Sequence, residues 1–212
     1  MRPLTDRIPK PLLEAGGKAL IVWHIEKLVR AGLTDLVINH AHLGTRIEQA
    51  LDDGSRFGAH IQYSPEAEAL ETAGGIANAL PILGHEPFVV INSDIFCDYD
   101  FARLNERATK LKDNDDAAHL VLVSNPPQHP SGDFGLQQQR VTDNTPKLTF
   151  SGIGIYQPSL FEGITRGSIA PLAPLLRAQI ALGNVSGEHH QGLWFDVGTP
   201  QRLDELDRQL RT

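Results

Sequence analysis

The polar residues that end an apolar run at 87–91 could act on a phosphorylated ligand. Asn92, Ser93 and Asp94 follow that run directly, where a buried strand would end. In an open parallel sheet, ligands bind beyond the carboxyl ends of the strands. Mg²⁺ prefers one or two carboxylates together with phosphate oxygens, which makes Asp94 a candidate metal ligand. Capping of a turn or of the next helix by Asp94 explains its position equally well.

A second carboxylate and a lysine have the same potential, although each also has a simpler explanation. Asp196 closes the apolar run at 193–195, where by itself it fits a turn residue or the cap of the last helix better than a ligand. Lys10 stands between Pro9 and Pro11, which restrict the backbone, so its ammonium group could be aimed at a phosphate. Its local sequence alone favours a solvated lysine in a proline-rich loop.

The segment from Glu71 to Gly75 contains two adjacent glycines, which indicate a turn leading into a helix. Such a turn lets the backbone approach a base or a phosphate closely. A Gly-Gly pair precedes many helices, so it is weak support by itself. Dinucleotide-binding, P-loop and nucleophile-elbow motifs are absent from the sequence, which counts against dehydrogenases, P-loop nucleotidases and α/β-hydrolases.

Composition limits the partners that this chain could bind. The net charge of −7 predicts no broad basic surface for nucleic acid or for anionic lipid, so we expect small-molecule ligands, no nucleic acid and no membrane. The single cysteine, Cys97, cannot form an internal disulfide or a thiolate zinc site, and the nine histidines lack zincin spacing. These features are typical of a cytoplasmic protein.

Hydrophobic spacing predicts the elements that would position these residues. Strands are expected at 35–39, 59–63, 87–94 and 119–123, and helices at 18–31, 47–51, 72–80, 101–111, 172–182 and 200–210. Strands that alternate with helices indicate βαβ units and a mostly parallel sheet. After Asn125, strands at 134–141 and 147–156 without an intervening helix indicate an antiparallel addition. A further strand ends at 194–196. We therefore predict an α/β fold, as a single domain over residues 1–212.

The order of short motifs along the chain is more specific than any one of them. The motifs are Met-Arg-Pro-Leu-Thr (1–5), Pro-Lys-Pro-Leu (9–12), Val-Ile-Asn-His (37–40), Glu-Thr-Ala-Gly-Gly (71–75), Ile-Asn-Ser-Asp (91–94), Phe-Ser-Gly-Ile (150–153) and Trp-Phe-Asp-Val-Gly-Thr-Pro (194–200). Over essentially its whole length, the chain resembles the sugar-1-phosphate nucleotidyltransferases, also called NDP-sugar pyrophosphorylases. The segments 38–41 and 53–58 are similar to those of the uridylyltransferases that act on N-acetylmuramate 1-phosphate in cell-wall recycling.

This resemblance implies a Rossmann-like fold of the nucleotide-diphospho-sugar transferase type and a reaction between UTP and a sugar 1-phosphate that releases pyrophosphate. It also implies a role for each candidate residue. Asp94 and Asp196 would bind Mg²⁺, and Lys10 would be the catalytic residue that neutralises charge on the nucleotide phosphates. Four residues would face the base or ribose, and three would face the sugar phosphate; they are Glu71, Thr72, Gly74 and Gly75, and Asn92, Asp133 and Gly152, respectively.

The family's first strand, its glycine-rich loop and an arginine normally precede the methionine at which this sequence starts. The resemblance therefore implies that this form is weakly active or inactive, and that a homo-oligomer formed by strand exchange could fill the place of the strand. Two other functions stay open, namely a mannose-1-phosphate guanylyltransferase-like enzyme and a non-catalytic remnant that binds sugar nucleotides. An in-frame upstream segment encoding the loop would favour the enzyme.

Overall fold

The computed structural model describes residue 1 and residues 3–211, so Arg2 of the opening motif lies outside the described residues. The chain forms two compact units, each assembled from separate segments. Unit 1 comprises Met1–Ala69, Asn92–Ala102 and Leu193–Thr212, and unit 2 comprises Leu70–Ile91 and Arg103–Gly192. The assignment of all 212 residues to a single domain stays a prediction.

Unit 1 holds three two-stranded sheets. β3 and β4 pair in parallel, whereas β1 with β2, and β6 with β12, pair antiparallel. The elements are the short 3-10 helices η1 (Leu4–Asp6), η2 (Lys10–Leu12) and η3 (Ser55–Phe57), the strands β1 (Glu14–Ala15), β2 (Lys18–Ala19), β3 (Asp35–His40), β4 (His60–Pro65), β6 (Ile95–Cys97) and β12 (Trp194–Asp196), and the helices α1 (Leu20–Arg30), α2 (Gly44–Leu51) and α6 (Pro200–Leu210).

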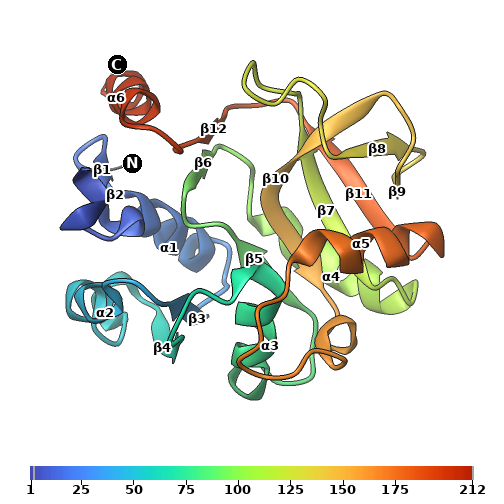
Figure 1. Ribbon diagram of the computed structural model, residues 1–212, viewed down its shortest axis with the longest axis horizontal. Coiled ribbons are helices and arrows are strands. Elements are labelled where there is room, and N and C mark those ends of the chain that lie inside the picture. Colours follow the sequence, from blue (N-terminus) through green and yellow to red (C-terminus); the bar gives the residue numbers. More distant parts are fainter. Residues whose placement is uncertain (2, 212) are drawn as a thin grey trace. The chain divides into compact units, whose positions relative to one another are not determined.

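Helix α1, drawn in blue in Figure 1, contributes residues to two hydrophobic clusters of unit 1. Its Ile21 and Ile25 are buried with residues of α2 and β4. Its Leu20 is buried with Phe96 of β6 and with residues of α6. Consecutive residues of a helix point about 100° apart, so one helix can serve both cores. The position of β6 therefore depends on the packing of α1.

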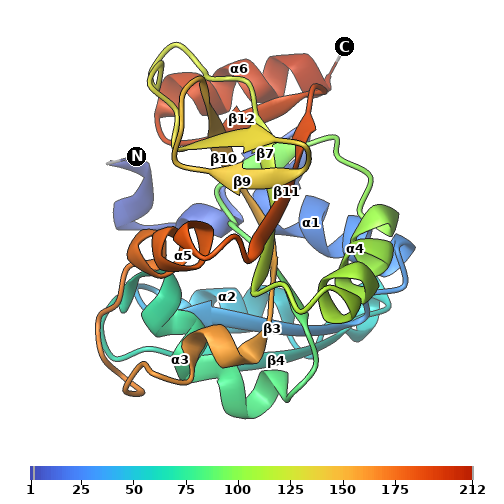
Figure 2. The ribbon, with the colours of Figure 1, turned by 90° about the vertical axis from the view of Figure 1, so that its right-hand side faces the viewer.

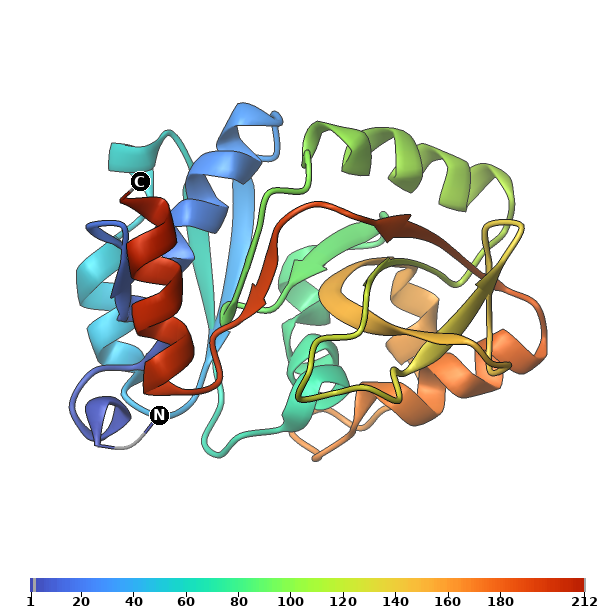
Figure 3. The same ribbon diagram turned by 90° about the horizontal axis from the view of Figure 1, so that it is seen from above.

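Unit 2 is built on one six-stranded sheet with the strand order β5-β10-β7-β11-β9-β8. Figures 2 and 3 show α4 on one face of this sheet and α3 with α5 on the other. The elements are β5 (Phe88–Ile91), β7 (Ala118–Val123), β8 (Phe134–Gln137), β9 (Arg140–Thr142), β10 (Lys147–Tyr156), β11 (Val185–His190), α3 (Glu71–Leu83), α4 (Ala102–Asp113), α5 (Leu172–Ala181) and the short 3-10 helix η4 (Pro158–Phe161).

The predicted α/β class is confirmed, and its sheets are mixed in direction. β7 and β11 run in parallel, but β10 pairs antiparallel with both β5 and β7. The segment expected as an addition thus supplies an internal strand of the main sheet. None of the described helices is long and apolar enough to cross a membrane.

Two strands of unit 2 differ from the sequence prediction. The stretch 134–141 was expected as one strand but contains β8, a turn and the first part of β9. Gln138 and Gln139 both adopt positive φ, which turns the chain between the two strands. Strand β11 was not predicted, since most of its residues are polar. It nevertheless pairs with β7 along its full length, which places its Val185 in the core.

Candidate active site

Lys10 begins the short helix η2, directly after the extended residue Pro9 and before Pro11. Its Nζ lies 2.6 Å from Oδ2 of Asp94, and the lysine side chain is 27% exposed. The stiff segment thus directs the ammonium group at a carboxylate. The alternative of a solvated loop lysine, favoured by the local sequence alone, does not describe this geometry.

Asp94 and Asp196 lie on neighbouring backbone segments of unit 1. Asp94 ends the turn before β6, and Asp196 ends β12, where it stands opposite Ile95. The backbone N–H of Val197 donates to the carbonyl oxygen of Asp94 over 2.9 Å. Residues about one hundred positions apart in the sequence are therefore brought to one end of the β6–β12 pair.

Arg202 of α6 holds the second of these carboxylates. Its Nη1 donates to the backbone oxygen of Asp196 at 3.1 Å and forms an ion pair with the side chain of Asp196. The hydroxyl of Thr199 caps α6 by accepting from the N–H of Arg202. A cation in the first turn of a helix is unfavourable, because the dipole is positive at that end. Arg202 in the first turn of α6 therefore indicates an acidic partner, a signal that the sequence prediction did not use.

Two side chains of α1 hold the backbone of β6. His24 Nε2 donates to the carbonyl oxygen of Ile95 over 2.8 Å, and Lys27 donates to the carbonyl oxygen of Cys97. Burial lowers the pKa of His24 to about 4, which keeps its ring neutral. Burial also lowers the pKa of Lys27, whose Nζ lies 4.9 Å from the ring centroid of Phe96. Sequence analysis missed this pair, although their i, i+3 spacing places both on one face of a largely apolar helix.

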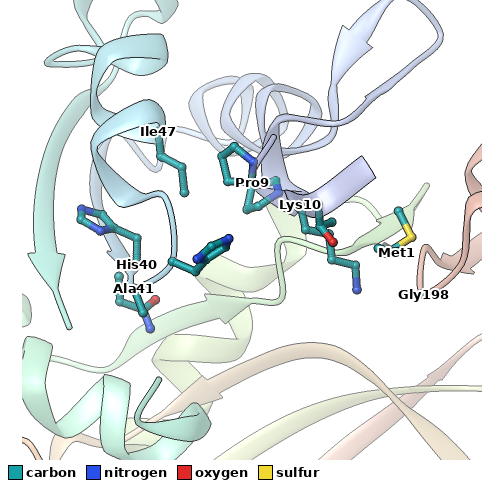
Figure 4. A pocket seen from close by; sticks show the side chains of 11 residues that line it. Met1, Pro9, Lys10, His40, Ala41, Ile47 and Gly198 are labelled. Atoms are coloured by element: carbon teal, nitrogen blue, oxygen red, sulfur yellow. The ribbon is translucent and has the colours of Figure 1, made fainter. Parts of the chain in front are cut away.

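A pocket of about 500 Å³ lies in unit 1 (Figure 4). Lys10 and Gly198 are two of its lining residues. A Cβ added at Gly198 would lie 3.2 Å from Oδ1 of Asp196, so this glycine lies against the carboxylate. The remaining lining residues come from the N-terminal segment, the end of β3 and α2: Met1, Thr5, Pro9, Pro11, Asn39, His40, Ala41, His42 and Ile47. The pocket therefore adjoins both predicted metal ligands through residues that contact them.

The helix predicted at 72–80 is confirmed as α3 of unit 2, but the turn expected at 71–75 is wrong, because these residues form the first turns of that helix. The N–H groups of Ala73 and Gly74 both donate to the carbonyl oxygen of Ala170, at 3.0 and 3.1 Å. A Cβ at Gly74 would lie 2.3 Å from Ser168 O, so this glycine permits close contact within the protein. Gly75 is also buried, whereas the side chains of Glu71 and Thr72 are exposed.

The three residues predicted to face the sugar phosphate occupy different surroundings. Asn92 lies in unit 1, where its carbonyl oxygen accepts from Ile95 N at 3.5 Å. In unit 2, Asp133 accepts from Phe150 N at 2.8 Å, which fixes the loop before β8 against β10. Gly152, two residues farther along β10, has φ +84° where the pairing of β10 with β7 shifts register. The structure thus brings Asp133 close to the segment that contains Gly152.

Comparison with known proteins agrees with the motif order. A sequence model of the family described as nucleotidyl transferase matches residues 1–212. N-acetylmuramate alpha-1-phosphate uridylyltransferase of Neisseria meningitidis is 53% identical over 210 residues, which cover 97% of this chain and 90% of that protein. Mannose-1-phosphate guanyltransferase of Hypocrea jecorina is 31% identical over 95% of this chain, which spans only 58% of the fungal protein.

Solved structures show the same fold. A Bacillus anthracis protein assigned as a glucose-1-phosphate thymidylyltransferase, crystallised with sucrose, superposes with a TM-score of 0.86 over 100% of this chain and 90% of its own. Its sequence identity is 21%, so this likeness concerns the fold alone. Because the family's sequence model spans the full chain and a relative is 53% identical over nearly all of it, this chain belongs to the nucleotidyl transferase family.

Proposed function

We propose that this protein transfers a uridylyl group from UTP to N-acetylmuramate 1-phosphate, releasing pyrophosphate, in the recycling of cell-wall sugars. The carrying observation is the Lys10–Asp94 ion pair, 2.6 Å long, next to the segment of Asp196 and beside a pocket. The name of the 53% identical relative supports the choice of base and sugar. UTP and sugar phosphates are cytoplasmic metabolites, so we propose that compartment.

The reaction needs positioning and charge neutralisation more than covalent chemistry by the protein. An oxygen of the sugar phosphate forms a bond to the α-phosphorus of UTP. The bond from that phosphorus to the bridging oxygen breaks, and its electron pair leaves with pyrophosphate. Lys10 supplies a compact positive charge that can move from Asp94 to the phosphates, because both partners are partly exposed.

The donor set around Lys10 fits a magnesium ion. Asp94 and Asp196 offer carboxylate oxygens, the ligand type that Mg²⁺ prefers, from two adjacent backbone segments. We propose that these two residues hold the ion, which when bound neutralises charge at the α-phosphate. Arg202 and Lys10 keep the carboxylates oriented by the contacts described above.

Unit 2 carries the residues that we propose for the other parts of the substrates. For a base or ribose we propose Glu71 and Thr72, which are exposed at the start of α3. Gly74 and Gly75 follow in the same helix, are buried and are retained as candidates for the same ligand. For the sugar phosphate, Asp133 and Gly152 are the candidate contacts in this unit, and Asn92 is a separate candidate in unit 1. The N–H groups of Ala73 and Gly74 donate to the carbonyl oxygen of Ala170, so we propose no ligand contact for them.

A substrate panel tests the proposal. Pyrophosphate release is measured with UTP or GTP, each paired with N-acetylmuramate 1-phosphate or mannose 1-phosphate. We expect release to be fastest with UTP and N-acetylmuramate 1-phosphate, and the product to have the mass of the UDP-sugar. Faster release with GTP and mannose 1-phosphate would support the guanylyltransferase alternative. Binding of the sugar nucleotide without any release would support a non-catalytic protein.

A further inference from the structure

The turn between β3 and α2 forms one wall of the pocket in unit 1. In Figure 4, His40, Ala41 and Ile47 lie on one side of the pocket, and Pro9 and Lys10 lie on the other. Asn39 and His40 are engaged within the protein: Nδ2 of Asn39 donates to Glu66 over 2.8 Å, and Nε2 of His40 lies 2.7 Å from Glu48. These two residues therefore shape the wall, and their polar side chains are already partnered.

The turn itself is held in one conformation. The His40 ring occupies the space beside Gly44, where an added Cβ would lie 1.9 Å from Nδ1. Leu43 adopts φ +56°, a left-handed conformation that is uncommon and strained for a residue with a large side chain. Strained residues of this kind cluster at functional sites. Between these fixed neighbours stands His42, which also lines the pocket.

His42 differs from the other two polar residues of this wall. Its side chain is exposed, and no hydrogen bond or ion pair joins it to another described residue. A neutral imidazole offers one N–H donor, and a protonated one offers two. Lys10, across the pocket, adds a positive charge. A donor and a cation that face the same space are suited to a ligand with several anionic oxygens.

We propose that His42 binds the β- and γ-phosphates of the nucleotide, that is, the part that leaves as pyrophosphate. This inference rests on the proposed function, because it assigns the pocket to the triphosphate of the donor. Negative charge develops on the leaving group as the bond to the α-phosphorus breaks, so a donor at that place favours the transition state. His42 acts here by hydrogen bonding, and the proposal involves no proton transfer.

Direct binding of inorganic pyrophosphate to the whole chain, measured by calorimetry in buffer with Mg²⁺, tests this role. We expect His42→Ala to weaken binding about tenfold, the usual effect of losing one hydrogen bond to a charged group. His42→Gln keeps an N–H donor and should retain most of the affinity. His85→Ala is the matched control, because it removes another exposed histidine, in the loop after α3. UMP, which lacks the leaving phosphates, should bind equally well to wild type and to His42→Ala.

The outcomes separate this inference from the proposed function. If Lys10→Ala weakens pyrophosphate binding and His42→Ala does not, His42 has no role in binding and the inference is wrong. The same conclusion follows if His42→Ala weakens UMP as much as pyrophosphate, because the substitution then acts through the fold. If wild type fails to bind pyrophosphate, or if neither substitution changes binding, the pocket does not hold the phosphates and both proposals lose this support.

Discussion

At the scale of single residues, the site depends on charges that are paired within the protein. Lys10 is paired with Asp94, and Arg202 with Asp196. All four side chains are about one quarter to one third exposed, so water screens each pair and its contribution to stability is small. These pairs are better explained as a means of orienting groups toward a ligand than as a source of stability.

Substitution of Lys10 should therefore affect catalysis much more than folding. We expect Lys10→Ala to lower kcat/KM by about 30- to 1,000-fold, because a charge that stabilises the transition state is lost. This corresponds to about 2–4 kcal/mol of transition-state stabilisation. The midpoint of thermal unfolding should change little, since exposed ion pairs contribute about 0–1 kcal/mol. Lys10→Arg should restore only part of the activity, because a planar fork replaces a compact charge. A large loss of melting temperature in Lys10→Ala would show instead that the residue is structural.

At the scale of elements, helix α1 fixes the strand that follows Asp94. His24 and Lys27 hold two backbone carbonyl groups of β6, and Leu20 packs against Phe96 of the same strand. The 3.6-residue pattern predicted α1, but the strand expected at 87–94 ends at Ile91 as β5, and β6 was not predicted. The hydrogen bonds of His24 and Lys27 were not predicted, because their spacing places both on one face of α1 but does not show which distant carbonyl group each side chain reaches.

The same limit explains the error at residues 71–75. Two glycines next to a helix normally indicate a turn, but here Gly74 is required by the approach of Ser168, almost one hundred residues away. Local sequence does not contain that contact. Strand β11 was missed for a related reason, since its pairing with β7 and β9 compensates for a polar sequence. The motif order, in contrast, pointed to Lys10, Asp94 and Asp196. The structure pairs the side chains of Lys10 and Asp94 and joins the backbone of Asp94 to that of Val197, while the roles of the three residues stay predictions.

The buried His24 predicts a particular dependence of stability on pH. Burial lowers the pKa of His24 from 6.5 to about 4 in the folded state, so protonation favours the unfolded state. The stability that neutral His24 contributes should be complete above pH 6.5 and lost as the pH falls toward 4. Over that interval the loss should approach about 3 kcal/mol. Denaturant unfolding of wild type and of His24→Gln at several pH values measures it. Equal slopes for both proteins would contradict this assignment.

At the scale of the whole molecule, β3 and β5 are among the described strands that pair along one edge only. Within the described part of the chain, β3 pairs only with β4, and β5 pairs only with β10. Exposed strand edges are templates for pairing with another chain. The expectation of a homo-oligomer formed by strand exchange is therefore retained as a proposal.

Light scattering at several protein concentrations tests this proposal. We expect the mean mass to rise above that of the monomer as concentration increases, because each edge can accept a strand from a second copy. Addition of salt should not reverse the association, since backbone hydrogen bonds rather than exposed charges drive it. A constant monomer mass at all concentrations would mean that both edges are protected.

We propose that Asp94 and Asp196 act as one site for nucleotidyl transfer. The most direct test is pyrophosphate release from UTP and N-acetylmuramate 1-phosphate by wild type, Asp94→Asn, Asp196→Asn and the double variant. Each single substitution should lower turnover by about a hundredfold or more, and the double variant should lose little beyond that, because groups that act as a unit are not additive. Unchanged turnover in either single variant, or losses that multiply in the double variant, would contradict the account.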